Sequence, residues 1–145
     1  MTMNHTLANL LHRSGQIMDA ARYEALKPLG LTPRQYQLLE CYAGGDNLSQ
    51  TDAVNQTGID RSTLADITRR LVSRGFLKRK RTKDDARAYE VGLTPTGIAV
   101  LDEARHLVTA SDTHTLSALT DADIKKISSG LQKIESSQAE ERKAA

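Results

Sequence analysis

The chain has 145 residues, of which 39% are hydrophobic and 26% charged, and this length predicts a single compact domain. No apolar run is long enough to cross a bilayer, which excludes a membrane-spanning protein. No basic segment followed by an apolar stretch marks the chain for export, so we expect a cytoplasmic protein without a membrane partner. The single cysteine, Cys41, excludes a disulfide scaffold.

Charge is distributed unevenly along the chain. The whole sequence has a net charge of +2, whereas ten basic and five acidic residues between Asp60 and Glu90 give that segment +5. A positive field concentrated in about a fifth of the chain favours a polyanion as partner.

The first predicted helix follows an apolar stripe from Leu7 to Ala25 and ends near Pro28. Three later helix starts are predicted by residue pairs with the spacing of a capping box. These pairs are Thr32 with Gln35, Ser49 with Asp52, and Thr120 with Asp123. Gly44-Gly45 and Gly58 are expected to end the first two of these helices.

A further helix is predicted from Asp60, a good N-cap, to Gly75. Its core stripe has helical spacing and consists of Leu64, Ile67, Thr68 and Leu71. The helical period then disappears, and two strands, Phe76–Arg79 and Ala88–Leu93, are expected to form a hairpin through the polar segment Lys80–Arg87.

Two more helices are predicted towards the C-terminus. The first begins at Thr94-Pro95 and has Ile98, Leu101, Ala104 and Val108 on one side. The last has a coiled-coil-like apolar face made by Ile124, Ile127, Leu131 and Ile134. We expect this excess of apolar surface to pack against a second subunit, and residues from about Gln138 onward to fray.

Two short helices joined through Gly58 and followed by a basic hairpin are the parts of a winged helix-turn-helix. The face of the Asp60–Arg74 helix opposite Leu64 carries hydroxyls and arginines. It consists of Ser62, Asp66, Arg69 and Ser73, flanked by Thr63, Ala65 and Arg70. Short hydroxyls approach base edges closely and arginines reach guanine or phosphate, so this helix is the predicted reader of the major groove.

The chain resembles the MarR (multiple antibiotic resistance regulator) family of bacterial transcription factors from Leu31-Thr32 through Leu48–Gly97, and the order and length of the helices extend the resemblance over nearly the whole chain. The most specific part is Asp85-Ala86-Arg87-Ala88, followed by Val91, Leu93, Thr94 and Gly97, which is similar to the wing signature of that family.

The resemblance implies a mainly α fold with a small β-hairpin. It places the winged helix-turn-helix at about 32–94 and dimerisation helices at about 5–27 and 95–137. It also implies a homodimer on a pseudo-palindromic double-stranded DNA operator, with Arg87 at the minor groove and Asp85 as its structural partner in the wing. The predicted DNA contacts are Ser62, Thr63, Asp66, Arg69, Arg70, Arg74, Lys78, Lys80, Lys83 and Arg87.

The family resemblance further implies a small-molecule effector, such as an aromatic or phenolic acid or its acyl-CoA thioester, that releases a repressor. The pocket is expected to draw on the first two helices. Its candidate polar lining consists of His12, Arg13, Ser14, Tyr23, Tyr36 and Tyr42.

Other functions have weaker support in the sequence. Some members of the MarR family sense oxidants through a cysteine early in the first helix, whereas Cys41 lies in a later apolar stretch. A redox-sensing regulator switched through Cys41 is therefore an alternative and not the main hypothesis. A protein-interaction module without specific DNA binding is another. The four histidines have no metal-ligand spacing and no catalytic motif occurs, so we expect no metal, no cofactor and no enzyme activity.

Overall fold

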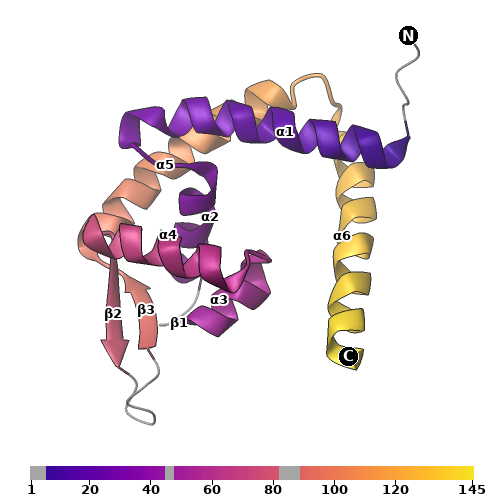
Figure 1. Cartoon of the computed structure of the whole chain (residues 1–145). Helices are drawn as coiled ribbons and strands as arrows, with labels where there is room; N and C mark the ends of the chain where they lie inside the picture. The colour runs from indigo at the N-terminus through magenta and orange to yellow at the C-terminus, as the bar shows by residue number, and fades with distance from the viewer. Residues whose placement is uncertain (1–5, 45–47, 82–88) are drawn as a thin grey trace. The chain divides into compact units, whose positions relative to one another are not determined.

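The computed structural model describes residues 6–44, 48–81 and 89–145 (Figure 1). Contacts divide the chain into two compact units, Met1–Asp112 and Thr113–Ala145. None of the helices in the described ranges is both long and apolar enough to cross a membrane.

The first unit begins with helix α1, Leu7–Leu26, followed by the short 3-10 helix η1, Lys27–Leu29, and by α2, Pro33–Ala43. After residues 45–47, a short strand β1, Leu48–Ser49, leads into α3, Gln50–Thr57. Helix α4, Arg61–Ser73, continues into strand β2, Leu77–Arg81. Strand β3, Tyr89–Leu93, is followed by α5, Pro95–Thr115.

Local capping chemistry begins these helices as the sequence predicts. Both partners of all three capping boxes bond reciprocally, at Thr32 with Gln35, Ser49 with Asp52, and Thr120 with Asp123. The Thr94 hydroxyl oxygen accepts a hydrogen bond of 2.9 Å from the Gly97 amide at the start of α5. Each cap satisfies amide groups that the first helical turn leaves unpaired.

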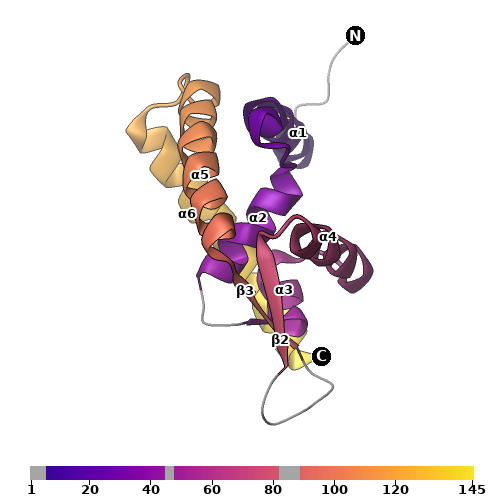
Figure 2. The same cartoon turned by 90° about the vertical axis from the view of Figure 1, so that its left-hand side faces the viewer.

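The predicted hairpin is part of a three-stranded antiparallel sheet with strand order β1-β3-β2. Leu77 pairs with Leu93 and Arg81 with Tyr89 across β2 and β3, while Leu48 pairs with Val91 across β1 and β3. The first strand of the hairpin is longer than predicted, because Lys80 and Arg81 pair with β3 rather than belonging to the turn. Strands β2 and β3 run side by side away from the C-terminal end of α4 (Figure 1), and Figure 2 shows the same unit turned by 90°.

The core of the first unit lies between α2, α4, the sheet and α5, and includes the C-terminal end of α1. Its largest fully buried side chains are Leu26, Leu38, Leu39, Leu64, Leu71, Leu77, Leu101, Val91 and Thr68. In α5 the core positions are Gly97, Leu101, Ala104 and Val108. The expectation for Ile98 was wrong, because this side chain is 50% exposed and Gly97 faces the core in its place.

The second unit contains the end of α5 and helix α6, Asp121–Ala144. The expected fraying from Gln138 was also wrong, because α6 remains helical to Ala144. Arg142 and Lys143 in its last turn are placed favourably for the helix dipole.

Candidate nucleic-acid interface

Helix α4 has a fixed inner face, which determines the direction of its outer face. Leu64, Ile67, Thr68 and Leu71 are all buried, as predicted. At its N-terminus the Asp60 carboxylate accepts a hydrogen bond of 2.9 Å from the Thr63 amide. Because one side of the helix is packed into the core, the helix cannot turn about its axis, and its opposite side is fixed towards solvent.

The outer face of α4 is polar and accessible. Ser62, Arg69, Arg70 and Ser73 are exposed, and Thr63 and Asp66 are half-buried. The Asp66 carboxylate pairs with both arginines, at 3.0 Å from Arg70 Nε and through a second ion pair with Arg69 Nη2. Asp66 therefore holds two guanidinium groups side by side, in pairs that are solvent-exposed and easily exchanged for phosphate contacts.

A residue outside the predicted set joins the two helices of the helix-turn-helix. Arg61 Nη2 donates a hydrogen bond of 3.2 Å to Thr51 Oγ1, which links the first turn of α4 to α3. The basic charge of Arg61 was apparent from the sequence, but its partner is ten residues away and was not.

Arg74, at the end of α4, is directed onto the protein. Its guanidinium donates to the Gly30 carbonyl at 2.7 Å and to the Leu29 carbonyl at 2.9 Å. It also lies 4.6 Å from the centre of the Phe76 ring. These contacts separate Arg74 from the two arginines that pair with Asp66.

The wing strand β2 presents four consecutive basic residues. Lys78, Arg79, Lys80 and Arg81 are all exposed, whereas Leu77 at the start of the strand is buried. Arg81 lies 5.8 Å from the centre of the Tyr89 ring on the paired strand. The predicted wing-tip residues Lys83, Asp85 and Arg87 lie outside the described residues.

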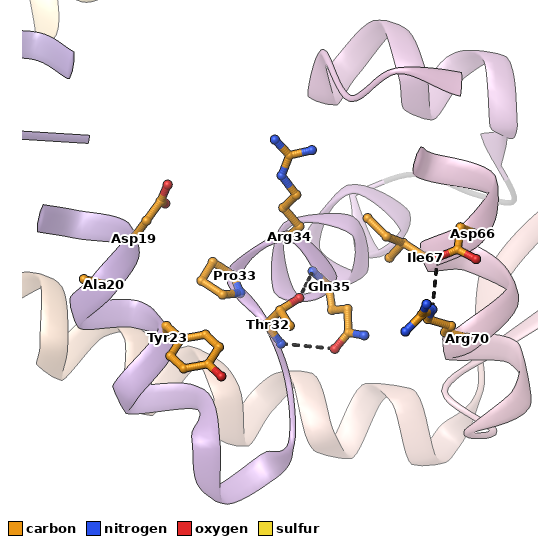
Figure 3. Close-up of a pocket in the computed structure, with 10 residues that line it drawn as sticks. All are labelled: Asp19, Ala20, Tyr23, Thr32, Pro33, Arg34, Gln35, Asp66, Ile67 and Arg70. Atoms are coloured by element: carbon orange, nitrogen blue, oxygen red, sulfur yellow. Dashed lines mark hydrogen bonds and ion pairs between the residues drawn. The ribbon is translucent and has the colours of Figure 1, made fainter. Parts of the chain in front are cut away.

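An open cavity of about 580 Å³ lies between α1, the start of α2 and the outer part of α4 (Figure 3). Its lining combines cationic, anionic, aromatic and apolar side chains. The lining residues are Asp19, Ala20, Tyr23, Thr32, Pro33, Arg34, Gln35, Asp66, Ile67 and Arg70. In Figure 3, Arg34 extends into the space between α1 and α4, and Arg70 lies beside Asp66 on the other wall.

The six candidate pocket residues are not brought together. Tyr23 lines the cavity, whereas His12, Arg13 and Ser14 are exposed on α1 and are not among its lining residues. Tyr42 is only 2% exposed and belongs to the core. The Tyr36 hydroxyl donates to Glu40 Oε1 at 2.8 Å.

Tyr36 and Glu40 belong to a polar network that sequence reasoning did not find. Arg105 on α5 donates to both Glu40 carboxylate oxygens, at 2.8 and 2.9 Å. This arginine lowers the pKa of Glu40, and burial together with the Glu40 carboxylate raises the pKa of Tyr36 to about 12. Glu40 and Arg105 are 65 residues apart, so no local pattern could reveal the pair.

A second ion pair joins α1 to α5. Arg22 donates to both oxygens of Asp112, at 2.8 and 2.6 Å, in a part-buried position. The hydrogen bonds that Arg22 donates to the Asp112 carboxylate raise the pKa of Arg22. Together the two networks attach α1 and α2 to α5 within the first unit.

Cys41 is half-buried, and its sulfur lies 3.4 Å from Gln56 Oε1. Burial raises the pKa of the thiol, which is opposite to the shift that activates redox-sensing cysteines. In the parts of the chain that the structure describes, no group of three or more His, Cys, Asp or Glu residues could hold a metal ion.

Known proteins are similar to this chain in sequence and in fold. The pattern of the MarR family matches residues 29–88. An HTH-type transcriptional repressor of Mycobacterium tuberculosis is 26% identical over 88% of this chain and 92% of its own length. A putative transcriptional regulatory protein for the hcr operon of Thauera aromatica is 29% identical over 65% of this chain, and the match spans 57% of that protein.

Two solved structures extend the likeness. A cysteine-to-serine mutant of MarR from E. coli, complexed with operator DNA, has a TM-score of 0.83 and 26% identity over 88% of this chain and 92% of that one. BpsR of Bordetella bronchiseptica, whose DNA binding is regulated by 6-hydroxynicotinic acid, has a TM-score of 0.83 and 27% identity over 89% of this chain and 98% of that one. The winged-helix fold, the family pattern over residues 29–88 and these relatives all support the MarR family of transcriptional regulators as the family that this chain resembles.

Proposed function

We propose that this chain represses transcription as a homodimer that binds a pseudo-palindromic operator in the cytoplasm and is released by a small-molecule effector. The observation that carries the proposal is the outer face of α4, where two exposed arginines pair with Asp66. The wing strand β2, which follows α4 in the chain, adds four exposed basic residues. A helix of this kind fits the major groove, and basic strand residues fit the adjoining phosphates.

Side-chain length and position decide which residues are assigned to bases and which to phosphates. Ser62 and Thr63 lie in the first turn of α4, where short hydroxyls reach bases or phosphates. Arg69 and Arg70 reach further. A planar guanidinium group recognises guanine through two parallel hydrogen bonds. Lys78, Lys80 and Lys83 are assigned to flanking phosphates, where they position the protein without reading sequence, and Arg87 is assigned to the minor groove.

A homodimer accounts for the apolar surface at the two ends of the chain. Leu7, Leu10 and Ile17 on α1 are 48–69% exposed, and four aliphatic residues on α6, Ile124, Ile127, Leu131 and Ile134, are 39–51% exposed. Contiguous aliphatic faces of this kind mark subunit interfaces. We therefore assign dimerisation to the helices at about 5–27 and 95–137, around a winged helix at about 32–94.

The cavity beside α4 is the proposed effector site. A volume of about 580 Å³ is in the range of small-molecule sites, and its apolar Pro33 and Ile67 and cationic Arg34 and Arg70 suit an aromatic acid. Arg70 lines the cavity and also pairs with Asp66. A bound carboxylate would compete for Arg70 and so change the outer face of the recognition helix.

Three single substitutions separate sequence reading from positioning. The protein itself enriches a duplex from a random-sequence library, here called the selected duplex, and each variant is titrated against it and a scrambled duplex at several salt concentrations. Arg69→Ala should cost about 1–3 kcal/mol at one base position. Lys80→Ala should weaken both duplexes alike and lower the salt slope by about one unit for each contact removed.

Arg87→Ala should weaken binding most where the flanks of the selected duplex are A·T-rich, because a narrow minor groove attracts a guanidinium. Binding of this variant like the parent to every duplex would refute the minor-groove assignment. If the parent protein enriches no sequence and its binding is insensitive to salt, the DNA-binding function is wrong and the interaction-module alternative is favoured.

A further inference from the structure

We propose that Arg74 positions the recognition helix by bridging its C-terminal end to the turn between η1 and α2, and that it does not bind DNA phosphates. This inference rests on the proposed function, because it concerns the orientation of α4 in the major groove. It differs from the sequence-based expectation, which grouped Arg74 with the DNA contacts on the ground of charge alone.

The guanidinium of Arg74 is engaged on its edge and on its face. Nη1 donates to the Gly30 carbonyl at 2.7 Å, and Nη2 donates to the Leu29 carbonyl at 2.9 Å. The guanidinium carbon Cζ lies over the Phe76 ring, 4.6 Å from its centre. Two charge-assisted hydrogen bonds and a cation–π contact fix both the place and the orientation of this side chain.

The turn whose carbonyls accept hydrogen bonds from Arg74 is itself fixed by a hydrogen bond and by burial of its neighbours. Gly30 adopts a left-handed conformation with φ of 62°, and its amide donates to the Lys27 carbonyl at 2.9 Å. The flanking residues Leu26 and Leu31 are buried. A Cβ on Gly30 would lie 3.3 Å from Arg74 Nη2, so the glycine permits the close approach of the guanidinium.

The other side of the same junction is held by α5. The Phe76 amide donates to the Leu71 carbonyl at 3.0 Å, and the Phe76 carbonyl accepts from the Thr94 amide at 3.0 Å. A Cβ on Gly97 would lie 2.0 Å from the Phe76 carbonyl oxygen. The end of α4 is therefore fixed by α5 through Phe76 and by the η1–α2 turn through Arg74.

This arrangement makes the bridge a mechanical connection between α1 and α4. Helix α1 runs directly into η1, whose last residue supplies one of the two carbonyls. A displacement of α1 would consequently be transmitted to the C-terminal end of the recognition helix. A phosphate that displaced these two carbonyls from Arg74 would release this end of the recognition helix.

The test keeps the positive charge of residue 74 and removes the pair of guanidinium nitrogens that bonds the two carbonyls. In Arg74→Lys, the single ammonium cannot bridge two carbonyls in the same plane or stack on Phe76 in the same way. We expect this variant to bind the selected duplex about tenfold more weakly, to bind the scrambled duplex like the parent, and to retain the salt slope. Arg142→Lys, the same exchange in the exposed last turn of α6, is the matched control and should leave both affinities unchanged.

Two further variants distinguish positioning from charge and from stability. Arg74→Ala should reproduce the loss of Arg74→Lys, with an unchanged salt slope. Phe76→Leu, which keeps the two hydrogen bonds and removes the ring, should give a smaller loss of preference for the selected duplex. All titrations are made at a temperature where thermal unfolding shows each variant fully folded.

The bridge would be refuted if Arg74→Lys binds like the parent while Arg74→Ala weakens both duplexes equally and lowers the salt slope, which is the behaviour of a phosphate contact. It would also be refuted if the variants change thermal stability alone and leave duplex preference intact. Amide hydrogen exchange without DNA tests the bridge even if the proposed function fails. Faster exchange of the Leu31 and Phe76 amides in Arg74→Lys supports it, and unchanged exchange contradicts it.

Discussion

Helices α4 and α6 have similar apolar periodicity and very different surroundings. In α4, Leu64 and Leu71 are completely buried, and Ile67 is 9% exposed. In α6, the four aliphatic residues at the same kind of spacing are 39–51% exposed. The apolar stripe is thus equally clear in both helices, but only the stripe of α4 is buried.

The difference shows what periodicity does and does not specify. A stripe of Leu and Ile specifies that one face of a helix must be covered, and neighbouring elements decide what covers it. Helix α4 is covered by α2, α3 and β2 within the first unit. For α6 we assign the covering to a second copy of the chain, so its contribution should depend on protein concentration and that of α4 should not.

The largest effect is expected from charges on the α6 face. Ile127→Glu combined with Leu131→Glu should convert the dimer to monomer and weaken binding to the selected duplex by a factor of about 10²–10⁴, because two linked sites become separate ones. Sedimentation and titration measure the two effects. Ser129→Glu with Ser136→Glu, on the opposite face, is the matched control, and equal loss of dimer in that control would contradict the assigned face.

The next largest effect should come from Gly97→Ala in the first unit. The added Cβ would lie 2.0 Å from the Phe76 carbonyl oxygen, which is backbone and cannot move aside. We expect the free energy of unfolding to fall by about 2–4 kcal/mol, measured by urea denaturation at several protein concentrations. A loss that disappears at high concentration would place the defect at the dimer contact instead.

A smaller and pH-dependent effect is expected from Glu40→Gln. Because Arg105 lowers the pKa of Glu40 in the folded state, the pair stabilises the protein at neutral pH. That contribution begins to fall as the pH drops below the unfolded pKa of about 4.3, and it is lost as the pH falls through the lower folded pKa.

The variant should therefore be less stable than the parent by about 1 kcal/mol at pH 7, with the difference vanishing at low pH. Asp102→Asn removes the more exposed partner of Arg105, at 3.3 Å, and should have less effect. A difference that grows as the pH falls would contradict the role of the pair. Urea denaturation between pH 3 and 7 measures it.

The smallest effect, and one of opposite sign, should come from Gly130→Ala in α6. A Cβ at this position meets nothing within 4 Å, so the gain in helix propensity should raise stability by about 0.5–1 kcal/mol. Thermal unfolding at fixed concentration checks the sign. Destabilisation would mean that the second copy approaches the backbone at Gly130.

Features that depend on neighbours in sequence could be predicted. The three capping boxes and the buried stripe of α4 each need only residues three or four positions apart, and all of them occur as expected. The outer face of α4 followed from the inner one, because a helix has only one direction opposite its core.

Features that depend on distant partners could not be predicted. Strand β1 has two residues and exists because Leu48 pairs with Val91 far along the chain. The Arg74 bridge and the Glu40–Arg105 pair join residues 44 and 65 positions apart. A basic residue at a helix end is typical of both a DNA contact and a structural clamp, and only the position of the Gly30 carbonyl distinguishes them.

The central claim, a dimer that presents two α4 helices to DNA, is tested most directly by hydroxyl-radical footprinting of the selected duplex at saturating protein. The account predicts two protected regions related by two-fold symmetry, on one face of the duplex and about one helical turn apart. Protection of a single asymmetric half-site by a monomer would contradict it.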